Sequence, residues 1–340
     1  MTYPLVSIIC LTYQHEPFIA SCIESVLSQT MPNWELVVID DGSSDATTSI
    51  VERYQDKRIT LVHGEHRGVS GLGDSYNLGL RSTRAPLVAI LEGDDYWPKH
   101  KLRVQCSAFD DDSVVLSYGK AVLVDSTGKT FGIHRHVPGP ARRANSPLGG
   151  ILVPLIATNF IVAATVMLRR GALEDVGGFY QPKGVPYVDH PTWLRLAHRG
   201  TFAYRDEILG FWRRHPSQIT TTTWLTGVPD RSAYLQDVLQ DAETLLNHVE
   251  MARLRDVVRN DARRQRDEAV LARARMALID EDWRHGAALF LGAARHGEMR
   301  TQLVSAAGLA ASLVRRDIEP LLGAMGRHRL PPRVQTRDKR

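Results

Sequence analysis

The chain has 340 residues, of which 43% are hydrophobic and 24% are charged, which excludes disorder throughout and allows one large domain with an appendage. A net charge of only +4 leaves no general nucleic-acid footprint, so nucleic acid is not an expected partner. Three dispersed cysteines, no secretory leader and no apolar run of about 18 residues predict a cytoplasmic protein without a disulfide framework or a membrane span.

The first hundred residues alternate between strand and helix patterns. Continuous apolar runs predict buried strands, and apolar residues that recur at helical spacing from Ile19 predict one face of a helix. Strands are predicted at 6–11, 36–39, 59–62 and 87–91, and helices at 19–27, 45–54 and 75–80. This alternation predicts an α/β fold with a mostly parallel, doubly wound sheet that binds ligands at the carboxyl ends of its strands.

Two acidic clusters follow two of the predicted strands. Asp40 and Asp41 end the second strand, and Glu92, Asp94 and Asp95 follow the fourth. Carboxylates about 4 Å apart repel by roughly 4 kcal/mol at an effective dielectric constant of about 20, and a divalent cation would relieve that repulsion. A hard cation held by one or two carboxylates completes its shell with water and substrate phosphates, which indicates a phosphorylated nucleotide ligand. The alternative is that each cluster only caps a turn between strand and helix.

Beyond residue 98 the pattern is mixed. Helices are predicted at 102–109 and 191–198, and strands at 114–118, 121–124, 164–168 and 208–212. The segment 134–150 is rich in Pro, Gly, Arg and His, which predicts a long loop that is either a functional lid or disordered. The pattern is helical from about residue 232. The predicted organisation is a domain over 1–228, a helical C-terminal region over 229–328 and a disordered basic tail over 329–340.

Four segments carry a more specific signal because they occur in a fixed order. They are SIICLTYQHEPFIASCIESVLSQTMPNWELVVIDDGSSDAT, NLGLRSTRAPLVAILEGDDYWPKHKL, VDHPTWLRLAHRG and RRHPSQIT. Over roughly the first 225 residues the chain resembles family 2 glycosyltransferases, which have the GT-A fold, a Rossmann-like, mostly parallel sheet flanked by helices. The resemblance implies an inverting transfer of a sugar from a nucleoside diphosphate donor to an acceptor hydroxyl in glycan, polysaccharide or glycolipid biosynthesis. It also implies Mg²⁺ or Mn²⁺ as the cofactor, a UDP-sugar as the commonest donor, and a glycan or lipid-linked acceptor.

The resemblance implies a donor site at the strand ends. Thr12 and Tyr13 after the first strand, with Asp40 and Asp41 after the second, would line the pocket for the base and ribose. A carboxylate there can accept hydrogen bonds from an imide N–H or from a ribose hydroxyl.

The metal motif of the family would correspond to the second acidic cluster. Glu92, Gly93 and Asp94 stand where the family has Asp-x-Asp, and Gly93 would let the donor approach the backbone closely. Glu92 replaces the usual Asp and its extra methylene shifts the carboxylate, so Asp94 and Asp95 are the preferred metal ligands.

The third segment implies the catalytic base. Asp189 matches the family's aspartate that removes the proton from the acceptor hydroxyl. Val188 stands where the family often has Glu, and the effect of this exchange on the pKa of Asp189 could have either sign. The alternative role for Asp189 is that of a helix N-cap ahead of Pro191.

The fourth segment implies a basic group at the diphosphate. Arg213 and Arg214 match a motif that faces the phosphates, and His215 would donate a hydrogen bond or bind the metal.

A competing function is a non-catalytic nucleotide-sugar-binding or scaffold protein on the same fold. A lesser hypothesis places the basic helical region against the inner face of a membrane, as a peripheral contact.

Overall fold

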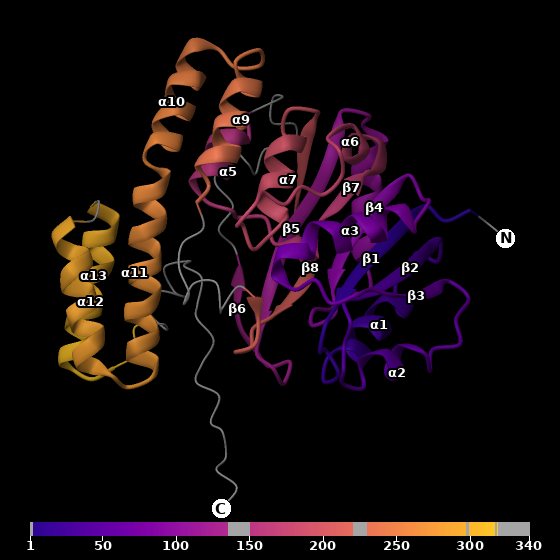
Figure 1. The fold of residues 1–340 in the computed structure, drawn as a ribbon, viewed down its shortest axis with the longest axis horizontal. Coiled ribbons are helices and arrows are strands. Elements are labelled where there is room, and N and C mark those ends of the chain that lie inside the picture. The colour runs from indigo at the N-terminus through magenta and orange to yellow at the C-terminus, as the bar shows by residue number, and fades with distance from the viewer. Residues whose placement is uncertain (1–2, 135–149, 220–229, 297–298, 317, 319–340) are drawn as a thin grey trace, which may run out of the picture.

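The computed structural model describes residues 3–134, 150–219, 230–296, 299–316 and 318. Figure 1 shows an α/β domain beside a column of long C-terminal helices. Nearly all of the predicted loop at 134–150 and the whole predicted tail at 329–340 lie outside the described residues.

One mixed sheet forms the centre of the α/β domain. Its strands are β1 (Val6–Thr12), β2 (Trp34–Asp40), β3 (Ile59–His63), β4 (Leu87–Glu92), β5 (Val114–Val124), β6 (Thr130–His134), β7 (Met167–Arg169) and β8 (Thr201–Arg213). The order is β3-β2-β1-β4-β7-β5-β6, and β8 pairs with β5. The first four strands are parallel, and β7 runs antiparallel between β4 and β5. The predicted parallel core is confirmed. The order of the strands changes direction at β1, because β2 and β3 lie on one side of it and β4 lies on the other, and α/β sheets bind ligands at such a switch point.

Helices cover both faces of this sheet. They are α1 (Ile19–Leu27), α2 (Thr47–Val51), α3 (Leu72–Arg81), α4 (Lys101–Cys106), α5 (Leu152–Ala157), α6 (Arg170–Asp175) and α7 (Asp189–Leu196). In β1, Ile8 packs in the apolar cluster with α1, α2 and α4, and the next residue, Ile9, packs in the cluster with α3, α5, α6 and α7. Successive side chains of a strand point to opposite faces, so a strand buried on both faces has the continuous apolar run from which it was predicted.

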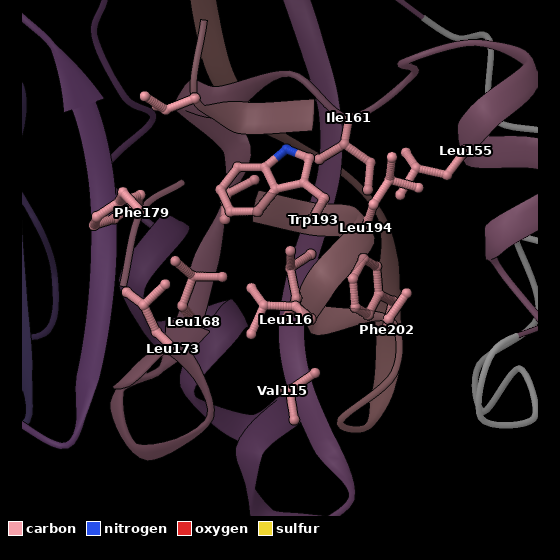
Figure 2. Packing of buried hydrophobic residues seen from close by; sticks show 14 of the residues in the cluster. Val115, Leu116, Leu155, Ile161, Leu168, Leu173, Phe179, Trp193, Leu194 and Phe202 are labelled. Carbon is pink, nitrogen blue, oxygen red and sulfur yellow. The ribbon is translucent and has the colours of Figure 1, made fainter. Parts of the chain in front are cut away.

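Helix α7 is fixed to the sheet by large apolar side chains. Figure 2 shows Trp193 and Leu194 of α7 among Leu116 of β5, Leu168 of β7 and Phe202 of β8. Trp193 and Leu194 have no exposed surface, and burying such a side chain contributes about 1.5–3 kcal/mol. The first residue of α7, Asp189, is therefore held at a defined place relative to the sheet.

The C-terminal region is helical, as predicted. It contains α9 (Ser232–Ala242), α10 (His248–Arg259), α11 (Asp261–Ile279), α12 (Trp283–His296) and α13 (Met299–Leu313). Helices α9 and α10 share the apolar cluster of α5 and α7, whereas α11, α12 and α13 form a cluster of their own. Within the described residues, no helix has the length and apolar character required to cross a bilayer. The domain boundary at residue 228 stays a prediction.

Candidate active site

The carboxyl ends of β1, β2 and β4 bring the predicted donor residues to one edge of the sheet. Thr12 stands opposite Asp40 in the β1–β2 register, and Leu11 stands opposite Glu92 in the β1–β4 register. Parallel pairing puts the ends of neighbouring strands side by side, so residues that are 28 and 81 positions apart in the sequence meet here.

At the end of β2, only one of the two carboxylate oxygens of Asp40 accepts a hydrogen bond from the described residues. Asp40 is buried, and its Oδ2 accepts a hydrogen bond from the backbone N–H of Ser43 at 3.0 Å. Its Oδ1 is buried without a hydrogen-bond partner in the described part of the chain. An unsatisfied buried acceptor costs about 1–3 kcal/mol, so this oxygen is suited to accept from a ligand N–H or hydroxyl.

Beside it, Tyr13 and Asp41 lie against a residue that the sequence patterns did not assign to the site. The ring of His66 stacks on Tyr13 with centroids 4.2 Å apart, and its Nδ1 is 3.0 Å from Oδ2 of Asp41. Oδ1 of Asp41 accepts from the hydroxyl of Ser75 at 3.3 Å. Tyr13 is 40% exposed, so this end of the site combines an accessible aromatic ring with a fixed carboxylate.

Gly93 lies where the backbone of β4 meets β1. A Cβ at this position would lie 2.6 Å from Nδ1 of His15 and 2.7 Å from Oγ1 of Thr12, which are in contact with each other at 3.2 Å. Any side chain would therefore displace both groups. His15 is another site residue that the sequence patterns did not assign. Its position three residues after the end of β1 was the available signal.

Asp94 is a buried carboxylate with strong partners. Nε2 of His215 lies 3.0 Å from its Oδ2, and Nε2 of Gln218 donates to the same oxygen at 3.3 Å. Burial alone would raise the pKa of Asp94, but the nearby charge of His15, the hydrogen bond and charge of His215, and the hydrogen bond from Gln218 outweigh it and hold the pKa at about 2. Asp94 is therefore ionised at neutral pH, and His215 lies next to it.

Asp95 and Glu92, in contrast to Asp94, have raised pKa values. Burial, with the charges of Asp94 and Glu92, raises the pKa of Asp95 well above its usual value. Oδ1 of Asp95 accepts from the backbone N–H of Arg213 at 2.7 Å, and its Oδ2 has no partner among the described residues. Burial and the charges of Asp94 and Asp189 raise the pKa of Glu92 to about 8, while the hydroxyl of Tyr76 donates to its Oε1 at 3.1 Å. Crowded carboxylates resist ionising together unless a cation joins them.

The two arginines after β8 have different environments. Arg213 is buried with its donors directed at backbone carbonyls: Nε at Asp94 (2.7 Å) and Nη1 at Asp125 and Ser126 (3.3 Å each). Arg214 is also buried, over the ring of Trp212 at 4.6 Å, and its Nε and Nη1 have no partner in the described part of the chain. Burial lowers the pKa of Arg214 to about 10, although the charges of Asp95 and Asp94 act to raise it. Arg214 is the arginine with donors left for an anion.

Asp189 is the first residue of α7, and the residue before it, Val188, makes no side-chain cap. Nδ2 of Asn159 donates to Oδ2 of Asp189 at 2.8 Å. Burial raises the pKa of Asp189 despite hydrogen bonds from the backbone of His190 and from Asn159, and despite the positive charge of Arg231. The charge of Asp189 in turn contributes to the raised pKa values of Glu92 and Tyr76, so the carboxylate faces the end of β4.

A divalent metal is compatible with these residues but has few protein ligands. Among the described residues, no group of three or more His, Cys, Asp or Glu side chains is arranged to hold a metal ion. Nε2 of His215 lies 3.0 Å from Oδ2 of the ionised Asp94, and the Oδ2 of Asp95, unpartnered among the described residues, adds a second carboxylate oxygen. Mg²⁺ is commonly bound by one or two carboxylates with substrate phosphates and water, so this donor set fits a cation that is bound together with a diphosphate.

Two curated glycosyltransferases are similar to this chain in sequence. A putative teichuronic acid biosynthesis glycosyltransferase, TuaG, of Bacillus subtilis is 30% identical over 224 residues, covering 65% of this chain and 83% of TuaG. WfgD of Escherichia coli, a UDP-Glc:alpha-D-GlcNAc-diphosphoundecaprenol beta-1,3-glucosyltransferase, is 37% identical over 202 residues, covering 56% of this chain and 69% of WfgD.

Solved structures share the fold. TarS 1–349 of S. aureus in complex with UDP-GlcNAc aligns with a TM-score of 0.61 at 17% identity, covering 91% of this chain and 87% of TarS 1–349. The mannosyltransferase PcManGT of Pyrobaculum calidifontis in complex with GDP-Man and Mn²⁺ aligns with a TM-score of 0.56 at 21% identity, covering 92% and 81%. The family model for Glycosyl transferase family 2 matches residues 7–177, half of the chain, including the carboxyl ends of β1, β2 and β4, so the chain belongs to glycosyl transferase family 2.

Proposed function

We propose that this glycosyltransferase moves a sugar from a UDP-sugar to a hydroxyl of a glycan or lipid-linked acceptor, with inversion, and that Asp189 is the catalytic base. The observation that supports it best is that Asp189 and Asp94, the partner of His215, both lie near enough to Glu92 at the end of β4 for their charges to raise its pKa. A base and a diphosphate-binding group near one strand end suit an in-line displacement at a sugar carbon bound between them.

The proposed reaction is a single displacement. The acceptor oxygen forms a bond to the anomeric carbon from the side opposite the diphosphate, and the bond from that carbon to the diphosphate oxygen breaks. The acceptor hydroxyl gives its proton to the carboxylate of Asp189, and the electron pair of the broken bond leaves with the diphosphate. Attack from the opposite side inverts the configuration at the anomeric carbon.

The leaving diphosphate gains negative charge during this step. Arg214 has buried guanidinium nitrogens without partners among the described residues, and such donors stabilise charge strongly because they lie in a low-dielectric environment. Asp94, His215 and Asp95 would hold Mg²⁺ or Mn²⁺, which acts as a Lewis acid on the phosphate oxygens when it is bound.

The donor and acceptor classes rest on similar proteins and on the site. TarS 1–349 forms a complex with UDP-GlcNAc, and the name of WfgD gives UDP-Glc as donor and a diphosphoundecaprenol-linked acceptor. At the base end of the site, the buried Oδ1 of Asp40, unpartnered within the described residues, and the exposed ring of Tyr13 suit the imide and the aromatic face of uracil.

A lipid-linked acceptor would bring the chain to the cytoplasmic face of a membrane. Arg259 and Arg266, on α10 and α11, and Arg273, further along α11, are exposed and would meet anionic lipid headgroups. Flotation with vesicles that contain anionic lipid, but not with neutral vesicles, is the expected result. Absence of the chain from both floated fractions would contradict this contact.

The donor site is tested first by thermal stabilisation. Purified chain is melted with UDP, other nucleoside diphosphates and their sugars, each with Mg²⁺, Mn²⁺ or a chelator. A ligand at 100 times its dissociation constant stabilises the folded state by about 2.7 kcal/mol. Stabilisation by UDP or a UDP-sugar that a chelator abolishes is the expected result. No shift with any nucleotide would contradict the proposed donor site.

Turnover is tested by release of UDP from the UDP-sugar that stabilises the chain. Asp189→Asn should abolish release and leave donor binding intact, whereas Asp175→Asn, an exposed aspartate at the end of α6, should change neither. Retained turnover in Asp189→Asn would remove Asp189 from the mechanism. The competing scaffold function, suggested by Val188 and Glu92 at motif positions, requires that the wild-type chain bind donor and release no UDP with any metal.

A further inference from the structure

Asn159 is the side chain that holds the proposed base. It follows α5, is exposed, and donates from Nδ2 to Oδ2 of Asp189 at 2.8 Å. A carboxylate has two oxygens, and a base needs one of them free with its lone pair directed at the acceptor hydroxyl. An amide donor on Oδ2 restricts the rotation of the carboxylate and thereby sets the direction of Oδ1 and its lone pairs.

The loop that carries Asn159 is anchored from the C-terminal helices. Nη2 of Arg231, just before α9, donates to the carbonyl of Ile156 at 3.1 Å and lies 3.1 Å from Oδ1 of Asp261, the first residue of α11. The side chains of Arg231 and Asp261 are each only 5% exposed. The carbonyl is three residues before Asn159, so a buried ion pair fixes the start of this loop.

The helix that carries Asp189 is tied to the same end of α5. Nε2 of His190 lies 2.9 Å from the carbonyl of Leu155, and Nδ1 lies 3.1 Å from the hydroxyl of Tyr234 on α9. Because a carbonyl only accepts, Nε2 carries the proton and Nδ1 accepts from the hydroxyl of Tyr234. Burial lowers the pKa of His190 well below its usual value, which agrees with this neutral ring. The loop that carries Asn159 and the helix that carries Asp189 are thus both fixed by hydrogen bonds to carbonyls at the end of α5.

On this geometry we propose that Asn159 is a positioning residue for the base: its amide orients the carboxylate of Asp189 so that one oxygen faces the acceptor hydroxyl. The inference rests on the proposed function for the role of Asp189, but the contact itself is tested without activity. Asn159 touches no reacting atom in this role.

The groups around Asp189 show in which direction Asn159 changes the pKa of Asp189. Burial raises the pKa of Asp189, whereas the backbone of His190, the amide of Asn159 and the charge of Arg231 act to lower it. The charge of Asp189 also contributes to the raised pKa values of Tyr76 on α3, Glu92 on β4 and Tyr187. Removing the amide should therefore raise the pKa of Asp189 further, and a carboxylate in its place should raise it most, by like-charge repulsion.

The direct test is a carboxyl titration of the full chain labelled with ¹³C-aspartate, with the Asp189 signal identified by its loss in Asp189→Asn. The pKa of Asp189 should rise by about 0.5–1 unit in Asn159→Ala and more in Asn159→Asp. Thr158→Ala, at the preceding loop position, is the matched control and should leave this pKa unchanged. An unchanged pKa in both Asn159 variants would overturn the proposal.

Kinetics then separate positioning from a purely structural contact. Asn159→Ala should lower kcat by about 10- to 100-fold with little change in the KM for the donor, and should move the acidic limb of the rate profile to higher pH. An unchanged kcat in Asn159→Ala would overturn the positioning role even if the pKa moves. Full turnover by Asp189→Asn would instead reject the base assignment, and a pKa shift caused by Asn159→Ala would then leave only the contact standing.

Discussion

At the residue scale, the neighbours Arg213 and Arg214 are chemically identical but have different environments. The guanidinium of Arg213 donates to backbone carbonyls of the loops that frame the site, while two nitrogens of Arg214 are unpartnered within the described residues. Adjacent positions in the sequence give no means of distinguishing the two arginines, because the carbonyls that accept from Arg213 belong to residues 94–126, about a hundred positions earlier. One arginine is suited to stabilise the loops and the other to bind a ligand.

Exchanging each arginine for methionine should separate these roles. Arg214→Met should weaken UDP binding by about 10- to 100-fold, since a hydrogen bond to a charged group contributes about 1.5–3 kcal/mol. It should not destabilise the fold, because it removes a buried cation whose Nε and Nη1 have no partner in the described part of the chain. Arg213→Met should lower the free energy of unfolding by about 3 kcal/mol, because buried carbonyls lose their donor. Calorimetry with UDP and urea denaturation measure the two effects, and equal loss of stability in both variants would contradict the distinction.

The raised pKa of Asp189 has a consequence for pH dependence. A base acts only as the carboxylate, so kcat should fall as the pH drops through the raised pKa, at a pH above the value of about 3.9 for an ordinary aspartate. The same shift affects stability in the opposite sense. Because the folded-state pKa exceeds the unfolded one, the contribution of Asp189 to stability is greatest below its unfolded pKa and is lost as the pH rises through its folded pKa.

Asp189→Asn should therefore be more stable than the wild type at neutral pH, and this difference should shrink towards acid. Urea denaturation at about pH 4 and about pH 7 checks the trend. If Asp189 is a functional carboxyl that is buried away from water, its replacement by Asn should abolish turnover and increase stability. The opposite trend, with the variant relatively more stable in acid, would mean that the pKa of Asp189 is lowered by folding.

At the scale of elements, sequence patterns located best the four parallel strands in the first hundred residues, β1 to β4. The runs predicted at 6–11, 36–39, 59–62 and 87–91 match β1 to β4 to within two residues at each end. Later strands were harder to predict. Strand β5 is one strand from Val114 to Val124 where two were predicted, because Gly119 and Lys120 resemble a break. Gly119 instead lets β8 approach closely: a Cβ there would lie 2.6 Å from Cδ1 of Leu209.

The start of β8 and the presence of α5 and β6 were also not predicted, because polar residues interrupt or flank their apolar patterns. Strand β8 starts at Thr201, seven residues before its predicted start, because the charged residues 205–207 lie in the middle of the strand and interrupt the apolar pattern. Helix α5, which carries Leu155 and Ile156, and strand β6 were not predicted, since both lie beside the polar segment 134–150. Tertiary pairing, rather than local pattern, defines these elements.

The contact between α5, α9 and α11 depends on one buried ion pair. Arg231→Met should destabilise the chain by about 3–5 kcal/mol, because it leaves Asp261 buried with only Arg264, at 3.7 Å among the described residues, to compensate its charge. The double variant Arg231→Met with Asp261→Leu should recover most of that loss, since two apolar side chains replace two buried charges. Urea denaturation gives both values. A double variant less stable than the single one would mean that the pair is not energetically coupled.

At the scale of the whole molecule, the sequence patterns named most residues of the candidate donor site and fewer of those on the proposed acceptor side. Residues at the ends of parallel strands, such as Asp40 and Asp94, can be predicted because the alternation of strand and helix determines where strand ends meet. Asn159 and His66 could not be predicted, since they enter the site from loops whose positions depend on contacts distant in sequence. The position of His15, three residues after the end of β1, indicated that it could lie at the site, but the sequence analysis assigned only the neighbouring Thr12 and Tyr13.

The division of the apolar core predicts how much of the C-terminal region the site requires. Helix α10 contributes Met251, Leu254 and Val258 to the cluster that contains α5 and α7, whereas α12 and α13 pack with α11 in a separate cluster. At about 1.5–3 kcal/mol for each side chain, loss of α10 removes about 5–9 kcal/mol, which equals the whole stability of many domains. Loss of α12 and α13 removes contacts from the separate cluster alone.

A chain that ends after Glu268 should therefore fold, retain stabilisation by UDP and melt close to the full chain, because it keeps α10 together with Asp261 and Arg264. A chain that ends after Asn247 should not fold. Circular dichroism and thermal melting with and without UDP compare the two truncations. If the shorter chain folds and responds to UDP, α10 is not part of the core of the site; if the longer one fails, α12 and α13 stabilise the α/β domain through α11.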